Sequence, residues 1–134
     1  MRPALSLGFF GLFGRSAVLR NFDADLRAVD LQPSLVPEAI KLTALRLLMD
    51  QTGGRDPSAE ASRATAEIIA YCMIGAEAFA GANGAPLAET IEKRVEAALA
   101  HGSSIDAKLI LLTLHAKVIQ PSVVDHFRLE VASD

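Results

Sequence analysis

The sequence has no tryptophan, one tyrosine and one cysteine among its 134 residues. A single cysteine excludes an internal disulfide framework and is typical of proteins kept in a reducing compartment, so we expect a cytoplasmic protein. Aromatic residues make up only 5% of the chain, although hydrophobic residues make up 51%. The apolar content is mostly alanine and leucine, which favours helices packed closely on helices over a sheet.

The chain also lacks an excess of positive charge. The net charge is −3, with eight Lys/Arg against eight Asp/Glu in residues 1–67 and five against eight in residues 68–134. Because neither half of the chain is basic, the charge argues against nucleic acid as a partner.

The most apolar stretch is GFFGLFG, residues 8–14, which holds three of the six phenylalanines. Only twelve residues separate Arg2 from Arg15, and proline and glycines interrupt them. A transmembrane helix needs about 20 predominantly apolar residues, so we expect no transmembrane segment here. A secretory signal is the nearest alternative, but Arg15 stands where a cleavage site needs a small residue.

We therefore expect residues 1–15 to be retained as an apolar N-terminal arm. An anchor lying in a membrane surface would need lysine or arginine along a polar face, which this segment does not have. The remaining interpretations are that the arm packs on its own domain or on a second chain.

Proline, glycine and serine residues mark the expected starts and ends of helices in the rest of the chain. The apolar spacing predicts five helices and a last helical turn or two over 121–127. The glycine-rich stretch 75–84 is expected to turn the chain. The expected ranges are 16–30, 37–53, 56–75, 86–101 and 103–120. The predicted fold is all-α: a single compact domain, residues 16–128, of five to six short helices in an irregular bundle, followed by a tail, residues 129–134.

The helix expected over 103–120 carries apolar residues on two sides, whereas an ordinary surface helix has one apolar stripe. One arc holds Ile105, Leu109, Leu112, Ala116 and Ile119, and the other holds Ile110, Leu111, Leu114 and Val118. Polar stripes, Ser104/Lys108/His115 and Asp106/Thr113/Lys117, separate the arcs. This helix is either sandwiched in the core or shared between the core and an interface.

The same spacing predicts which side chains are buried together. The expected core comprises Phe22, Leu26, Ile40, Leu47, Ile68, Cys72, Ile91, Val95, Leu109 and Leu112.

Residues that could carry chemistry are few. His101, His115 and His126 form no i, i+4 pair, so no metal site is predicted. Asp125 and His126 could be half of an acid–base pair, but spacing places no nucleophile beside them. Cys72 lies in an apolar run without a nearby cation, which indicates inert packing. We therefore predict no catalytic, cofactor-binding or metal-binding residues.

The amount of apolar surface that such a small chain must cover suggests a helical protein–protein interaction module that self-associates as a homodimer. An unidentified protein is the further partner considered. The interface candidates are Phe9, Phe10, Phe13, Ile110, Leu111, Leu114 and Val118. The alternative is a binder of a small apolar or acyl ligand between helices, which would show a closed apolar cavity. An enzyme using Asp125 and His126 ranks last and would show a polar cleft around the histidine.

Overall fold

The computed structural model describes residues 17–129, and the expected all-α class is confirmed there. The arm predicted over residues 1–15, with its interface candidates Phe9, Phe10 and Phe13, lies outside the described residues, as does the tail from residue 130. After helical residues 17–28, the elements are the 3-10 turn η1 (Pro33–Leu35), α2 (Glu38–Gln51), α3 (Ala59–Ile74), α4 (Ala76–Asn83), α5 (Ala85–Ala100), α6 (Ile105–His115) and α7 (Pro121–Phe127).

The described residues contain seven α-helices, slightly more than the five to six predicted, because the glycine-rich stretch expected to turn the chain forms α4. Alanine favours a helix here. Gly75 and Gly84 flank α4 at φ angles of 93° and 95°, a backbone region that glycine enters without a steric penalty. These two glycines turn the chain at both ends of the helix.

Two helices begin later than predicted because a different residue caps each of them. Asp56 was the expected cap of α3, but the Ser58 hydroxyl accepts a hydrogen bond from the amide of Ala61 at 3.0 Å. Ser104, rather than Ser103, caps α6 by accepting from the amide of Ala107 at 3.1 Å. Each serine satisfies a backbone donor that has no partner within the helix.

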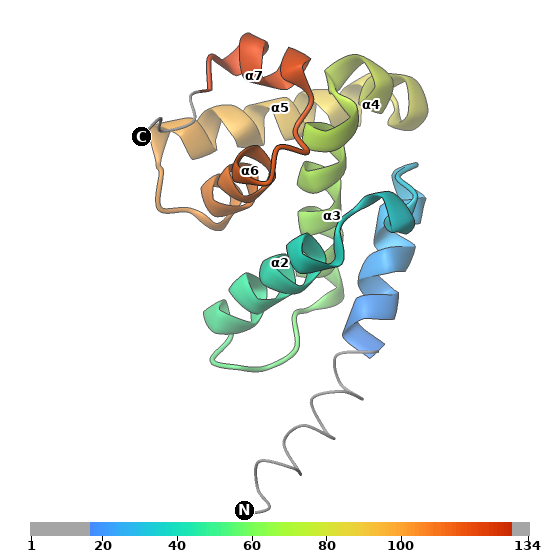
Figure 1. Cartoon of the computed structure of the whole chain (residues 1–134), viewed down its shortest axis with the longest axis vertical. Helices are drawn as coiled ribbons and strands as arrows, with labels where there is room; N and C mark the ends of the chain where they lie inside the picture. The colour runs from blue at the N-terminus through green and yellow to red at the C-terminus, as the bar shows by residue number, and fades with distance from the viewer. Residues whose placement is uncertain (1–16, 130–134) are drawn as a thin grey trace, which may run out of the picture.

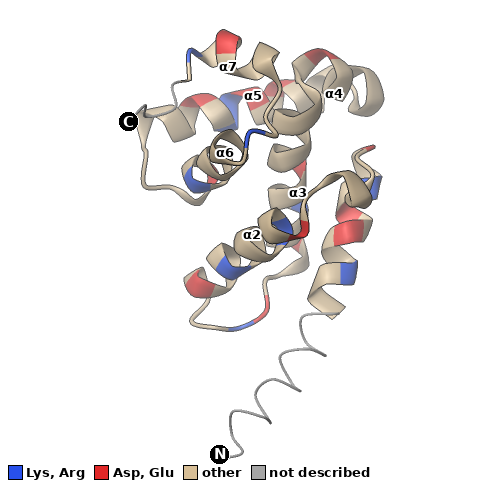
Figure 2. Cartoon of the chain, in the orientation of Figure 1, with Lys and Arg blue, Asp and Glu red and all other residues tan. Residues whose placement is uncertain are grey.

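α3 runs through the middle of the structure (Figure 1). Residues 17–28 and α2 lie toward one of its ends, and α4, α5 and α7 lie toward the other. α6 packs against α3, α5 and α2, so three helices surround it. Acidic and basic residues are interspersed along the helices, without a large region of one sign (Figure 2).

The buried apolar side chains form one connected core that draws on every α-helix from residues 17–28 to α7. Eight of the ten predicted core residues are buried, from Phe22 in the first helix to Leu109 in α6. Leu47 and Leu112 are only partly buried and pack against the edge of the core.

α6 has one broad buried face rather than two separate ones. Its buried residues come from both predicted arcs and include Thr113, which belongs to the polar stripe between them. Thr113 can face the core because its hydroxyl donates to the carbonyl of Ile110 at 2.8 Å. Asp106, on the same stripe, accepts two hydrogen bonds from Arg94. The other stripe, with Lys108 and His115, faces outward.

α6 ends at His115, five residues before the predicted end at Gln120. The amide of Lys117 donates to the carbonyl of Leu114, and the amide of Val118 donates to that of Thr113, each at 3.1 Å. This pair of bonds is a Schellman motif, which requires a left-handed residue and usually takes glycine. Here Lys117 holds that position at φ 62°. The sequence does not signal this end because no glycine marks it.

Candidate functional site

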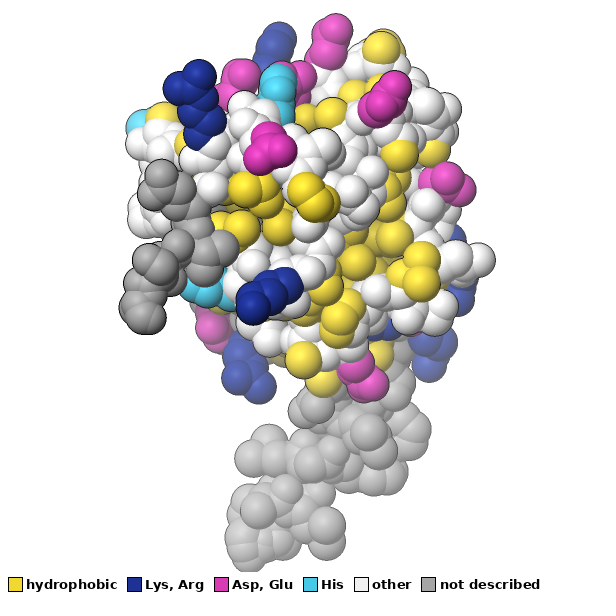
Figure 3. Space-filling model, turned by 45° about the horizontal axis from the view of Figure 1, so that its top comes forward, with side chains coloured by type: hydrophobic (Ala, Val, Ile, Leu, Met, Phe, Trp, Pro, Cys, Tyr) yellow, Lys and Arg dark blue, Asp and Glu magenta, His cyan; other side chains and the backbone are white. Residues whose placement is uncertain are grey.

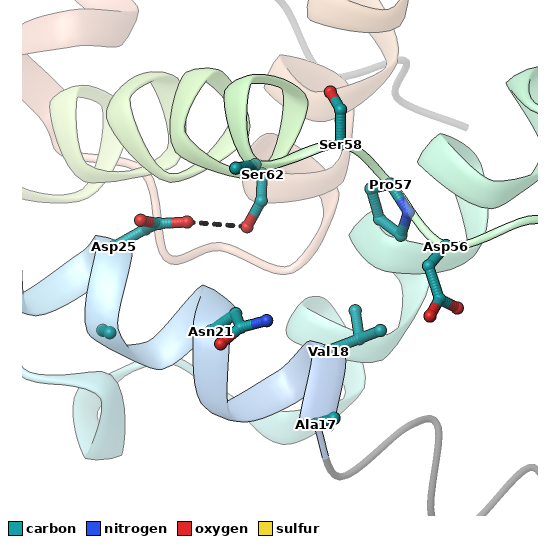
Figure 4. Close-up of a pocket in the computed structure, with 10 residues that line it drawn as sticks. Ala17, Val18, Asn21, Asp25, Asp56, Pro57, Ser58 and Ser62 are labelled. Atoms are coloured by element: carbon teal, nitrogen blue, oxygen red, sulfur yellow. Dashed lines mark hydrogen bonds between the residues drawn. The ribbon is translucent and has the colours of Figure 1, made fainter.

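A cleft of about 460 Å³ separates the first helix from the segment leading into α3 (Figure 4). Asn21 and Asp25 line one wall, and Asp56, Ser58 and Ser62 line the other. The hydroxyl of Ser62 donates to the carboxylate of Asp25 at 2.7 Å and ties the two walls together. Alanine, valine and proline side chains share the lining with these polar groups, and the cleft is open to solvent, unlike the closed apolar cavity that an acyl ligand requires.

Sequence reasoning missed this cleft because its two walls are about thirty or more residues apart in the chain. The only local signal is the cap at Asp56-Pro57-Ser58, which predicts a helix start and carries no information about what packs beside it.

The interface candidates on α6 are not equally available at the surface. Ile110 and Leu114 are buried within the single chain, where they pack in the core. Val118 is partly buried and lies beyond the end of α6. Leu111 is 45% exposed, so it is the candidate that the structure places most openly at the surface.

Within residues 17–129, two further leucines are exposed besides Leu111: Leu35 in η1 at 66% and Leu99 in α5 at 49%. Figure 3 shows hydrophobic side chains gathered in a band across one face, with charged side chains mostly around its edges. Apolar surface that forms a contiguous patch is a common feature of protein interaction sites.

His126 of the hypothetical Asp125–His126 pair lies beside a different carboxylate, that of Glu92. His126 Nε2 lies 3.0 Å from a carboxylate oxygen of Glu92 in α5, and its side chain is 57% exposed. This pair connects α7 to α5 at the surface, where ion pairs contribute little to stability. Among residues 17–129, no three His, Cys, Asp or Glu side chains are grouped to hold a metal ion.

The one tyrosine and the one cysteine are both buried beside each other in α3. Burial raises the pKa of Cys72 from 9.0 to about 12, although a hydrogen bond with Thr113 opposes the rise. Burial also raises the pKa of Tyr71 from 10.0 to about 12, and the charge of Glu92 adds to this. The Tyr71 hydroxyl is buried without a hydrogen-bond partner among the described residues. A thiol with so high a pKa is protonated at neutral pH, so it does not provide a nucleophile.

Arg94 joins three helices through its guanidinium group. It donates to both carboxylate oxygens of Asp106, at 2.7 and 3.0 Å, and lies 3.7 Å from Glu67. All three side chains are only about one-fifth exposed. The planar fork of arginine matches a carboxylate in this bidentate geometry. The cluster fixes α5 against α6 and α3, with one carboxylate hydrogen-bonded to the guanidinium group and a second carboxylate beside it.

No single helix within residues 17–129 is both long and apolar enough to cross a membrane. α5 and α6 together meet the criteria of length and composition, but they are bent by 93° where they join. Comparisons with protein families, curated proteins and solved structures give no match to this chain.

Proposed function

We propose that this protein is a small helical interaction module that forms a homodimer through apolar surface on α6. The observation that carries the proposal is that α6 leaves leucines at the surface, since Leu111 is 45% exposed and Leu112 is only partly buried. The two leucines flank the outward-facing row of Lys108 and His115. A second copy that covers these side chains gains about 25 cal/mol for each Å² of apolar surface removed from water. A two-fold dimer is the most common arrangement for such an association.

Figure 3 supports an apolar contact between chains in general, because one face carries a band of hydrophobic side chains with charged side chains mostly around its edges, as a polar rim surrounds an interface core. The sequence of residues 8–14 supplies three further phenylalanines for the same contact. The cleft does not favour the alternative of an apolar ligand, because it is open to solvent and carboxylates, hydroxyls and an amide share its lining with apolar side chains.

Sedimentation equilibrium of the full chain tests the proposal. We expect a dimer at tens of micromolar, and we expect Leu111→Lys to weaken dimerisation by about tenfold or more, because the interface would have to bury an unpartnered ammonium group. Leu35→Lys is the matched control, since Leu35 is the most exposed large apolar residue and lies on η1 rather than on α6.

The outcomes separate clearly. A monomeric wild-type chain at tens of micromolar would overturn the proposal. If Leu35→Lys weakens the dimer and Leu111→Lys does not, the interface does not lie on α6. Replacing Phe9, Phe10 and Phe13 together with serine measures how much the N-terminal arm contributes to dimerisation. An unchanged dimer would show that the arm is not part of the interface.

A further inference from the structure

We propose that two copies of this chain exchange α7: residues 116–119 straighten to prolong α6, and α7 of each copy packs where the partner's α7 packs in the single chain. This inference rests on the proposed self-association and names the segment that carries it. Three observations support it: a strained hinge, a lightly held helix and an apolar surface that straightening would lengthen.

The hinge is strained in the single chain. Lys117 adopts a left-handed conformation, with φ 62°. For a residue that has a side chain, this conformation is higher in free energy than it is for glycine. The local sequence favours a helix instead, since the apolar spacing of α6 continues through Val118 and Ile119. Gln120 is already extended at ψ 137°, as the residue before Pro121 must be. Straightening therefore involves residues 116–119 only.

α7 is held by few contacts. It has seven residues, too few to be stable as an isolated helix, and it is absent from the pairs of helices that pack extensively. Its attachment includes buried Val123, the ring of Phe127 at 6.4 Å from that of Tyr71, and the exposed pair of His126 with Glu92. Ser122 also lies close to Gly75. The amide of Gln120 also donates to the carbonyl of Cys72 at 2.8 Å.

The surface that receives α7 is specific to it. The side chains of Val123 and Phe127 are four residues apart, so they lie on one face of the helix. The ring of Phe127 lies 6.4 Å from that of Tyr71 in α3, and Phe79 in α4 packs edge to face with the same tyrosine, with ring centroids 5.6 Å apart. A second copy carries the same α7 and offers the same contacts. Exchange therefore preserves the packing of α7 while it relieves the strain at Lys117.

A prolonged α6 would also extend the apolar surface assigned above to dimerisation. In the single chain, Val118 and Ile119 are partly buried against the core. In a prolonged α6, Val118 would lie two helical turns from Leu111 and Ile119 two turns from Leu112, on the two sides of the row formed by Lys108 and His115. Two such helices could pair along these residues. The exchange thus explains how one short helix with one well-exposed leucine could form an interface of useful size.

Lys117→Gly tests the hinge in the full chain. Glycine relieves the left-handed strain in the single chain and is a poor residue in a straightened helix, so both effects favour the monomer. Because each dimer contains two hinges, we expect its dissociation constant to rise by about tenfold or more. Asp30→Gly is the matched control: Asp30 ends the first helix in the same conformation, at φ 69°, away from the hinge. It should stabilise the chain and leave the dissociation constant unchanged.

Crosslinking shows the exchange directly. Chains carrying Glu92→Cys are mixed with chains carrying His126→Cys, allowed to equilibrate, and treated with a short bismaleimide under native conditions, in which Cys72 is buried. In an exchanged dimer, position 126 of one chain lies beside position 92 of the other, because these residues are in contact within one chain. We expect a crosslinked species that contains one chain of each kind.

A wild-type dimer that Lys117→Gly leaves unchanged, with no mixed crosslink, would overturn the exchange while the proposed self-association stands. A wild-type chain that stays monomeric would overturn both. If Asp30→Gly raises the dissociation constant as much as Lys117→Gly does, the exchange is also overturned, because the effect is then unrelated to the hinge.

Discussion

Leu109→Ala is expected to lower the free energy of unfolding by about 2–5 kcal/mol. Leu109 is fully buried on α6, the helix that α2, α3 and α5 surround, so its truncation leaves a cavity that no single neighbour can fill. Urea denaturation followed by circular dichroism measures the change. With a total stability of about 5–15 kcal/mol for a typical domain, a loss of this size removes a large share of it.

Leu111→Ala is the matched control, because it makes the same chemical change two residues away at a side chain that is 45% exposed. We expect it to change the free energy of unfolding of the monomer by about 0.5 kcal/mol or less. Similar losses for both substitutions at a concentration where the chain is monomeric would contradict the assignment of the buried face of α6.

Raising the pH from 9 to about 12 is expected to remove several kcal/mol of stability through Cys72 and Tyr71. In the unfolded chain the thiol loses its proton above pH 9.0 and the phenol above pH 10.0, whereas the folded chain holds both protons until about pH 12. Deprotonation therefore favours the unfolded state. The contribution of both groups is fully present below pH 9, and it is lost as the pH rises toward 12. Each unit of pKa difference is worth about 1.4 kcal/mol.

Urea denaturation across this range gives the slope of stability against pH. Cys72→Ala and Tyr71→Phe should each flatten the slope, and the slope remains informative even where a variant is less stable at every pH. The phenolate absorbance of the folded protein reports Tyr71 alone, since the chain has one tyrosine and no tryptophan. A tyrosine that titrates near pH 10 while the protein stays folded would contradict the burial of its hydroxyl.

Features with a local cause were predictable from the sequence. The all-α class follows from composition and spacing, and the last residue of α3 and both ends of α5 follow from glycine and proline near the expected positions. Most of the predicted core, including Phe22 and Ile91, is buried because each residue lies on the apolar face of its own helix.

Features that depend on tertiary contacts were not predictable. Thr113 and Asp106 look like a solvated stripe until the structure supplies their hydrogen-bond partners. Lys117 carries no sign that it adopts a left-handed conformation, so the end of α6 was placed too late. The cleft needs Asp25 beside Ser62, residues that only the packing of two helices brings together.

The Arg94–Asp106 pair also bears on the order in which the chain folds. It joins residues twelve apart, whereas Asp25 and Ser62 are 37 apart. Closing a shorter loop costs less chain entropy, so the corner between α5 and α6 can form before the first helix is recruited. In rate measurements, Asp106→Asn should therefore slow folding, while Asp25→Asn should mainly speed unfolding. The opposite pattern would place the nucleus at the other end of the molecule.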